Sequence, residues 1–333
     1  MSSHPSKLVL LGTAGGPLPS PVRSGISSAL VVGGRTYVVD CGSGVTRQLR
    51  RSRLLGGLHR VLLTHLHSDH TCDYFNLFLL GWPILQWSPP VHVFGPGPAG
   101  GAAALPPDGG GRPVVIHHPA NPTPGLADLT DASLEAHAYD INIRMLEAGR
   151  HDLRALIVPH EIALPIGLDA GGPDRVAPDM EPILVEEDDE VRVTATLVRH
   201  APVFPAFAYR FDTAEGSVVF SGDTAPCANL VRLAGGADIL VHEVFDESVD
   251  EPEPGVGDDD AWEAQRRNHH MVTSHTPLTE VGRIAAEADV GRLVLTHFIP
   301  GDDTKPDEHW LKGVAGGFDG EVVVGADLME LTL

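Results

Sequence analysis

The chain has 333 residues, 42% hydrophobic and 20% charged, which is the composition of a globular protein with a sizeable core. Its 23 basic and 45 acidic residues give a formal net charge of −22, and such a field repels polyanions, so we expect no nucleic-acid partner. No apolar run reaches the roughly 18–20 residues of a membrane span. We therefore expect a cytoplasmic protein without a membrane partner.

The first hundred residues alternate between strand and helix patterns. Short apolar runs predict strands, and longer amphipathic or apolar segments predict helices. The sequence predicts strands over 7–12, 28–32, 36–39, 59–65 and 91–96, and helices over 44–54 and 71–80.

The rest of the chain is denser in strands. Strands are predicted over 191–200, 206–213, 217–224, 237–243, 291–298 and within 320–333, and helices over 126–149, 226–236 and 278–288. Loop or arm insertions are expected near 97–125, 149–182 and 246–274, where Gly, Pro or acidic residues gather. The pattern favours an α/β fold of two β-rich halves with helices outside, in a single domain over residues 1–333.

The segment "LTHLHSDH" at residues 63–70 holds three histidines and an aspartate directly after a predicted strand. These residues are His65, His67, Asp69 and His70. Imidazole and carboxylate groups are zinc ligands, and the carboxyl ends of strands are where ligands bind in open α/β sheets. Four such groups within six positions predict a metal site.

Three later strands also end in a residue of this kind. His200, Asp223 and His297 each follow an apolar run that predicts a strand. A single residue of this type is more often structural. Three repeats of the same pattern supply the ligands that a two-metal site needs beyond the first cluster.

These motifs resemble those of the metallo-β-lactamase superfamily over nearly the whole chain. The segments "THLHSDH", "SGDT" and "LTHF" carry the resemblance, which is closest to the branch of tRNase Z and arylsulfatase-like hydrolases. The resemblance implies an αβ/βα sandwich, with two mixed sheets flanked by helices and metals at the rim between the sheets.

The resemblance also implies a ligand set and a reaction. It implies two zinc ions per chain, with Mn²⁺ or Fe²⁺ as alternatives, and a metal-bound hydroxide as the nucleophile. The resemblance implies that Asp69 is both a metal ligand and a catalytic residue. The implied ligands are His65, His67 and His200 for one metal, Asp69, His70 and His297 for the other, and Asp223 as the bridge.

Two further residues are implied to move protons. Glu243, in the pair His242–Glu243, and the downstream His275 match a relay in which a carboxylate holds an imidazole that protonates the leaving oxygen. The alternative is a histidine that only bonds loop backbone. Asp40, at the end of a predicted strand, is expected to support the ligands from behind.

The roles of several other residues stay open. The pairs His117–His118 and His269–His270 either line the site, bind metal adventitiously or lie in exposed loops, of which the last is favoured. Four aromatic residues either wall an apolar pocket or belong to the core, which is commoner. They are Trp82, Trp87, Phe204 and Phe207.

For the substrate, the sequence favours a small molecule, either an ester, a lactone, a phosphodiester or a sulfate ester. The alternatives are hydrolytic dehalogenation of chlorinated aromatics, tRNA 3′ processing by an endoribonuclease, and a non-catalytic metal-binding protein. We disfavour tRNA because the candidate arm at 149–182 has no Lys and six acidic residues. The resemblance also allows a homodimer.

Overall fold

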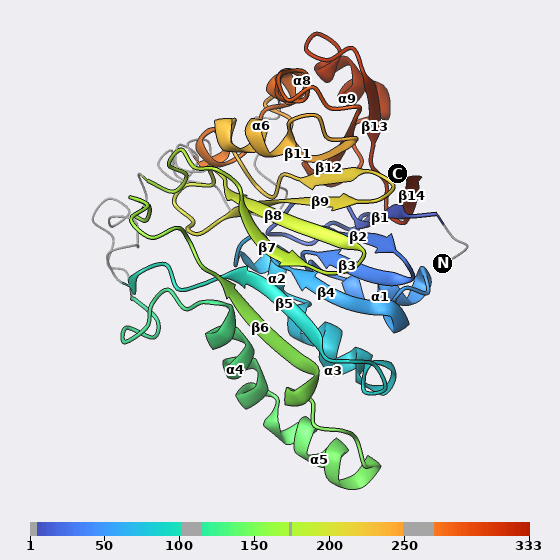
Figure 1. Cartoon of the computed structure of the whole chain (residues 1–333), viewed down its shortest axis with the longest axis vertical. Coiled ribbons are helices and arrows are strands. Elements are labelled where there is room, and N and C mark those ends of the chain that lie inside the picture. Colours follow the sequence, from blue (N-terminus) through green and yellow to red (C-terminus); the bar gives the residue numbers. More distant parts are fainter. Residues whose placement is uncertain (1–4, 102–114, 173–174, 249–269) are drawn as a thin grey trace.

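The computed structural model describes residues 5–101, 115–172, 175–248 and 270–333. Two seven-stranded sheets pack face to face, and helices cover their outer faces (Figure 1). The two mixed sheets and their flanking helices confirm the predicted αβ/βα sandwich.

The first sheet contains the N-terminal strands and the last strand of the chain. Its strands β3 to β6 run parallel to one another, so their carboxyl ends lie at the same edge. In spatial order the sheet is β14 (Met329–Thr332), β1 (Lys7–Gly12), β2 (Ser27–Val32), β3 (Arg35–Val39), β4 (Leu58–Leu62), β5 (Val91–Pro96) and β6 (Ile157–Ile162).

The second sheet contains the strands of the later part of the chain. Strands β10 to β13 are parallel, whereas β7, β8 and β9 pair antiparallel. In spatial order the sheet is β13 (Glu321–Val324), β12 (Arg292–Ile299), β11 (Ile239–Phe245), β10 (Ser217–Phe220), β9 (Phe207–Thr213), β8 (Val191–Leu197) and β7 (Ile183–Glu187).

The helices divide between the two sheets (Figure 1). Beside the first sheet are α1 (Val45–Arg51), η1 (Leu55–Gly57), α2 (Ser68–Thr71), α3 (Tyr74–Leu85), α4 (Leu126–Ala136), α5 (Ala138–Ala148) and η3 (Arg154–Leu156). Beside the second sheet are α6 (Ala228–Ala234), α8 (Leu278–Glu287) and α9 (Asp307–Val314).

The layers follow from alternation along the strands. In β3, Tyr37 and Val39 enter the core between the sheets, and Val38 between them enters the core shared with α1 and α3. In β11, Val241 lies between the sheets, whereas Leu240 and Val244 pack in the core under α6 and α8. Both faces of each sheet are therefore buried, which explains the nearly continuous apolar runs in its parallel strands.

Two predicted segments differ from the structure. The helix predicted over 126–149 is two helices, and the break falls at His137, which ends α4 and precedes α5. The insertion predicted at 149–182 contains β6, an edge strand, so part of it belongs to the first sheet. β6 forms because it pairs with β5. This pairing depends on tertiary structure, and the Gly and Pro residues of the surrounding segment led to the prediction of an insertion instead. In the described part of the chain, no helix is long and apolar enough to cross a membrane.

Candidate metal centre

Strand ends from both sheets meet at one rim of the sandwich. The chain leaving β4 carries His65 and His67, and α2, which follows at once, carries Asp69 and His70. From the second sheet, His200 follows β8, Asp223 follows β10, and His297 lies near the carboxyl end of β12. All seven residues that the resemblance proposes as ligands are brought together here.

The first cluster consists of His65, His67 and His200, whose ligand atoms all lie within 4.8 Å of one another. Their ring centroids are 4.6–5.0 Å apart, and His200 Nε2 lies 3.1 Å from His67 Nδ1. Three imidazole nitrogens at this spacing match the three protein ligands of an open zinc site.

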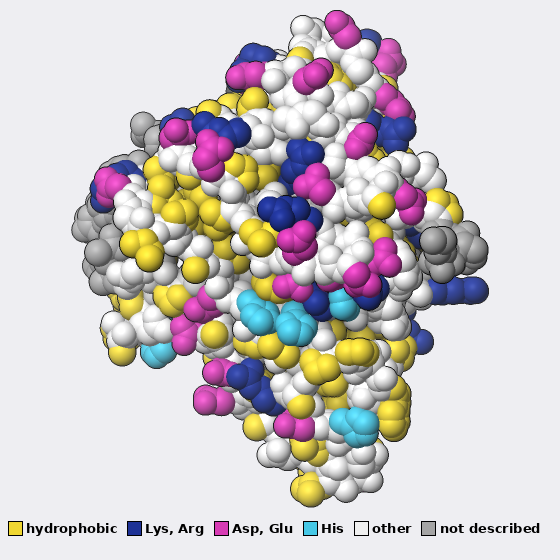
Figure 2. Space-filling view, in the orientation of Figure 1, with side chains coloured by type: hydrophobic (Ala, Val, Ile, Leu, Met, Phe, Trp, Pro, Cys, Tyr) yellow, Lys and Arg dark blue, Asp and Glu magenta, His cyan; other side chains and the backbone are white. Residues whose placement is uncertain are grey.

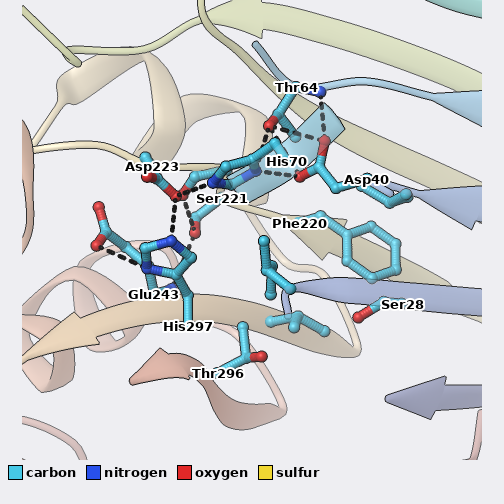
Figure 3. A pocket seen from close by; sticks show the side chains of 14 residues that line it. Ser28, Asp40, Thr64, His70, Phe220, Ser221, Asp223, Glu243, Thr296 and His297 are labelled. Carbon is cyan, nitrogen blue, oxygen red and sulfur yellow. Dashed lines mark hydrogen bonds and ion pairs between the residues drawn. The ribbon is translucent and has the colours of Figure 1, made fainter. Parts of the chain in front are cut away.

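The second cluster consists of Asp69, His70, Asp223 and His297, with ligand atoms again within 4.8 Å of one another. Asp69 Oδ2 lies 3.5 Å from Nε2 of both His70 and His297. Figure 3 shows His70, His297 and Asp223 turned toward one another. This cluster can hold a second divalent cation through nitrogen and oxygen atoms.

Asp223 lies between the two clusters. Its Oδ1 is 3.2 Å from His70 Nε2 and 3.3 Å from His297 Nε2. Its Oδ2 faces the other cluster, 3.9 Å from His65 Nε2 and 4.0 Å from His200 Nε2. The two oxygens thus point toward different clusters, which is the arrangement a bridging carboxylate needs.

Several of these polar atoms are buried without a hydrogen-bond partner. They are Nε2 of His65, His70 and His297, and Oδ1 of Asp223. A buried polar atom left without a partner costs about 1–3 kcal/mol. These four atoms belong to the two clusters, and a divalent cation in each cluster would satisfy them. The residues present therefore fit a pair of metals.

Burial and mutual proximity also set the protonation of the ligands. Burial holds the pKa of His65 and of His200 well below its usual range, so both rings are neutral and can donate a lone pair. Burial opposes the charge on Asp223, but His297 and His70 outweigh it and hold the pKa of this carboxyl well below its usual range.

Hydrogen bonds behind the ligands fix their orientation. Asp40 Oδ2 accepts from His70 Nδ1 at 2.9 Å, and its Oδ1 accepts from the Thr64 backbone N–H at 2.8 Å. The Thr64 hydroxyl lies 3.1 Å from His65 Nδ1. His200 Nδ1 donates to the Ser274 carbonyl at 2.9 Å. The contacts to His65, His70 and His200 each hold Nδ1 and turn Nε2 toward the clusters, and Asp40 contacts His70, one of the proposed ligands.

Two residues of the centre have left-handed backbone. Asp40 has φ of 61° and His297 has φ of 46°. Such conformations are uncommon outside glycine and cluster at functional sites. Both residues follow apolar strand segments, so the left-handed turn redirects the chain and aims each side chain at the rim.

Glu243 and His275 form a buried pair beside the clusters. Glu243 Oε2 accepts from His275 Nδ1 at 2.8 Å, and Oε1 of the same carboxylate accepts from the Thr224 backbone N–H. Burial, and then the nearby Asp223, raise the pKa of Glu243, while burial lowers the pKa of His275. The contact has the geometry of a carboxylate that orients an imidazole.

The remaining candidates are placed as follows. His117 and His118 are exposed, and His269 lies outside the described residues. Trp82 and Phe207 are fully buried in the core, Phe204 packs partly buried against it, and Trp87 is 74% exposed, so these residues form no common wall. His270, by contrast, lies at the centre, with its ring centroid 5.9 Å from that of His200.

Sequence reasoning left His270 open and missed Ser274. The two are four positions apart in a helical turn, with the Ser274 hydroxyl 3.1 Å from His270 Nδ1. Residues i and i+4 share one face of a helix. The i, i+4 spacing of His270 and Ser274, directly before His275, is the sequence signal that could have identified both residues.

With this fold and this site, the chain belongs to the metallo-beta-lactamase superfamily, whose family model matches residues 22–297. Membership and the two clusters together imply divalent metal ions in a hydrolase. Among curated proteins the chain is 33% identical to Ribonuclease Z of Mycobacterium avium (strain 104), over 97% of this chain and 96% of that protein. It is 32% identical to Ribonuclease Z of Mycobacterium bovis (strain BCG / Pasteur 1173P2), with the same coverage.

Solved structures share the fold. The short form of human tRNase Z superposes with a TM-score of 0.61 at 22% identity, covering 98% of both chains. The metallo-beta-lactamase fold protein YhfI from Bacillus subtilis has a TM-score of 0.60 at 18% identity, covering 98% of this chain and all of that one.

The similarity to Ribonuclease Z contradicts two predictions made from the sequence. The preference for a small-molecule substrate and the exclusion of nucleic acid are both wrong. The expectation of no nucleic-acid partner assumed that all charges of the protein act together on a ligand. The fields of exposed charges are, however, screened within about 8–10 Å at physiological salt.

The surface acids are also partly paired. Asp189, Glu187 and Asp179 contact Arg35, Arg192 and Arg232. Figure 2 shows acidic and basic side chains interspersed on one face of the molecule. The net charge therefore says little about any particular groove.

Proposed function

We propose that this chain is a metal-dependent endoribonuclease that removes the 3′ extension of precursor tRNA. The observation that carries the proposal is similarity to Ribonuclease Z along 97% of the chain, in a protein whose candidate ligands all meet at one rim. A remnant that had lost catalysis would not be expected to keep every ligand.

In this proposal two metals are held by the residues described above. His65, His67 and His200 would hold one, Asp69, His70 and His297 would hold the other, and Asp223 turns one oxygen toward each cluster. When bound, divalent metals polarise a phosphoryl oxygen and lower the pKa of water. The protein's own contribution is to fix the metal positions, through Asp40 and Ser274, and to align the scissile phosphate.

We propose that His275 and Glu243 handle the proton of the leaving group. A tRNA needs a free 3′-hydroxyl to accept an amino acid, so the bond cleaved is the one between phosphorus and O3′. Because Glu243 holds His275 through Nδ1, the ring can deliver a proton only from Nε2. Asp69, beside both His70 and His297, is proposed to contact the reacting centre as well as a metal.

The finer properties of the protein are also proposals. We propose zinc as the metal at two ions per chain, with Mn²⁺ or Fe²⁺ as alternatives, a single domain over residues 1–333 and a cytoplasmic location. A homodimer would bury the apolar face of α5, where Tyr139, Ile143 and Leu146 are 85%, 46% and 85% exposed. Sedimentation of the wild type and of Ile143→Glu tests this: a shift from dimer to monomer supports it, and a monomeric wild type contradicts it.

The experiment that tests the function is cleavage of a 3′-extended precursor tRNA by the purified protein. We expect a single cut that leaves a 3′-hydroxyl on the tRNA, lost on chelation and regained when metal is returned. The Asp223→Ala variant is the matched inactive control. Absence of cleavage by metal-replete wild type, under conditions where a known tRNA 3′-processing enzyme cuts the same RNA, would falsify the proposal.

A further inference from the structure

The chain that leaves β1 passes directly against the second cluster of the metal centre. At Gly16, a Cβ atom would lie 2.5 Å from Oδ2 and 2.6 Å from Cγ of Asp69. At Gly15, a Cβ atom would lie 3.0 Å from both Cε1 and Nδ1 of His297. In the described part of the chain, the atoms nearest to these two positions belong to two residues of the second cluster and to none of the first. The backbone of the two glycines therefore packs against the ligands of one metal.

The atom that Gly16 approaches is the one through which Asp69 faces the site. Asp69 Oδ2 lies 3.5 Å from Nε2 of both His70 and His297. A Cβ atom practically never lies within 3.0 Å of an atom to which it is not bonded. Glycine at position 16 therefore lets the backbone come this close, and the backbone then limits where the carboxylate oxygen can move.

Hydrogen bonds hold this part of the chain in place. The Phe298 N–H donates to the Thr13 carbonyl, and the Gly15 N–H donates to the Phe298 carbonyl, both at 3.0 Å. The Thr13 hydroxyl donates to Asp327 Oδ1, also at 3.0 Å. The backbone cannot move away from the cluster without breaking these bonds. The Asp69 side chain is only partly buried and can change its rotamer, so a methyl group at position 16 would displace the carboxylate rather than the backbone.

The same backbone also restrains the second ligand that it contacts. Phe298 directly follows His297, so the two bonds between Phe298 and the chain after β1 fix the backbone next to this ligand. A methyl group at Gly15 would press on the ring from the side of Nδ1, and Nε2 would shift from its place 3.3 Å from Asp223 Oδ1.

We propose that Gly15 and Gly16 are positioning residues for the second metal. Their backbone fixes Asp69 and His297 where both can reach one cation, and it thereby sets the metal affinity of the second cluster without touching the first. The inference concerns metal binding alone and does not depend on which substrate is cleaved.

The test measures the two metal affinities in glycine variants. Zinc is titrated against a competing chelator, with elemental analysis at each chelator concentration, at a temperature where circular dichroism shows every variant folded. His67→Ala and His297→Ala assign the binding steps, because each removes a ligand from one cluster only.

Gly282→Ala is the matched control for a steric clash elsewhere. A Cβ atom on Gly282, in α8, would lie 2.6 Å from the Val314 carbonyl oxygen, and neither residue belongs to a cluster. This variant should unfold at a lower denaturant concentration than wild type and keep both metal-binding steps.

We expect Gly16→Ala to bind the second metal about 10- to 100-fold more weakly than wild type, the usual cost of losing a group that orients a ligand. Binding of the first metal should be nearly unchanged. Gly15→Ala should weaken the same step by a smaller factor, since its contact with the His297 ring is longer than the contact of Gly16 with Asp69.

Equal weakening of both steps in the glycine variants, or a native second step in both, would overturn the inference. If Gly16→Ala does not fold, Gly15→Ala decides by the same two criteria. If neither folds while Gly282→Ala does, the two glycines are needed for folding rather than for metal position, and the inference is wrong. RNA cleavage is not a readout here, so a wild type that cuts no precursor tRNA would contradict the proposed function and leave this inference standing.

Discussion

Replacement of Asp40 by Asn should weaken metal binding at one cluster and largely spare the other. In the native site, Asp40 Oδ2 accepts from His70 Nδ1 at 2.9 Å, and Oδ1 accepts from the Thr64 N–H at 2.8 Å. Asparagine has only one acceptor oxygen. If that oxygen stays on Thr64, the amide NH₂ faces His70 Nδ1, and the ring must give up its Nδ1 proton to avoid opposing donors.

The proton then moves to His70 Nε2, the nitrogen 3.2 Å from Asp223 Oδ1 that belongs to the second cluster. Loss of such an orienting partner typically lowers metal affinity 10- to 100-fold, which is about 1.4–2.7 kcal/mol. His67 and His200 do not contact Asp40, and His65 is linked to it only through the Thr64 hydroxyl. The first cluster should therefore keep most of its affinity.

Competition between the protein and a zinc chelator, followed by elemental analysis at each chelator concentration, measures the two affinities. We expect one weakened and one nearly native binding step. Asp188→Asn is a matched control, since that carboxylate also accepts from a hydroxyl and an imidazole, Tyr37 and His59, but lies outside both clusters. Equal weakening of both steps, or an unchanged titration, would refute the assignment of Asp40 to His70.

Three other variants test neighbouring parts of the centre. Asp223→Ala removes an oxygen from each cluster, so elemental analysis should find metal lost from both and cleavage nearly abolished; full occupancy would exclude the bridge. His275→Ala should keep its metal and lose about 10²–10⁴-fold in rate on RNA, but little on a bis-nitrophenyl phosphodiester, whose leaving group needs no proton; equal losses on both would exclude proton delivery. Burial lowers the pKa of His242 to about 4, so the neutral folded form loses roughly 3 kcal/mol of stability as pH falls from about 6.5 to 4. In denaturant unfolding, the free energy of unfolding of His242→Leu should lack this part of the pH dependence. The same dependence of that free energy on pH in wild type and variant would contradict the prediction.

The ligands could be predicted because they follow apolar strands closely. His65, His67, Asp69 and His70 fall within six positions, and His200, Asp223 and His297 repeat the strand-then-ligand pattern. A parallel strand needs only its apolar run to be recognised, and its carboxyl end then marks the rim. The same runs predicted the strands of both sheets except β6 and β7, which were not predicted.

What could not be predicted depends on contacts between distant segments. His200 bonds to Ser274 although the two residues are 74 positions apart, and no local sequence pattern encodes this contact. His270 lies only one helical turn before Ser274. The left-handed backbone of Asp40 and His297 likewise follows from their place at the rim. The substrate was mispredicted because a net charge of −22 sums groups that never act together on one ligand.

The supply of ligands from both sheets has a consequence for how the chain matures. Four candidate ligands follow β4 in the first sheet, but His297 comes from β12, and β14 at the end of the chain pairs with β1. A nascent chain on the ribosome can present the His65–His70 segment long before the second half exists. The complete centre can form only once both halves have been synthesised and docked. Bound metal would then link the two sheets and stabilise the docked state relative to a partly folded chain.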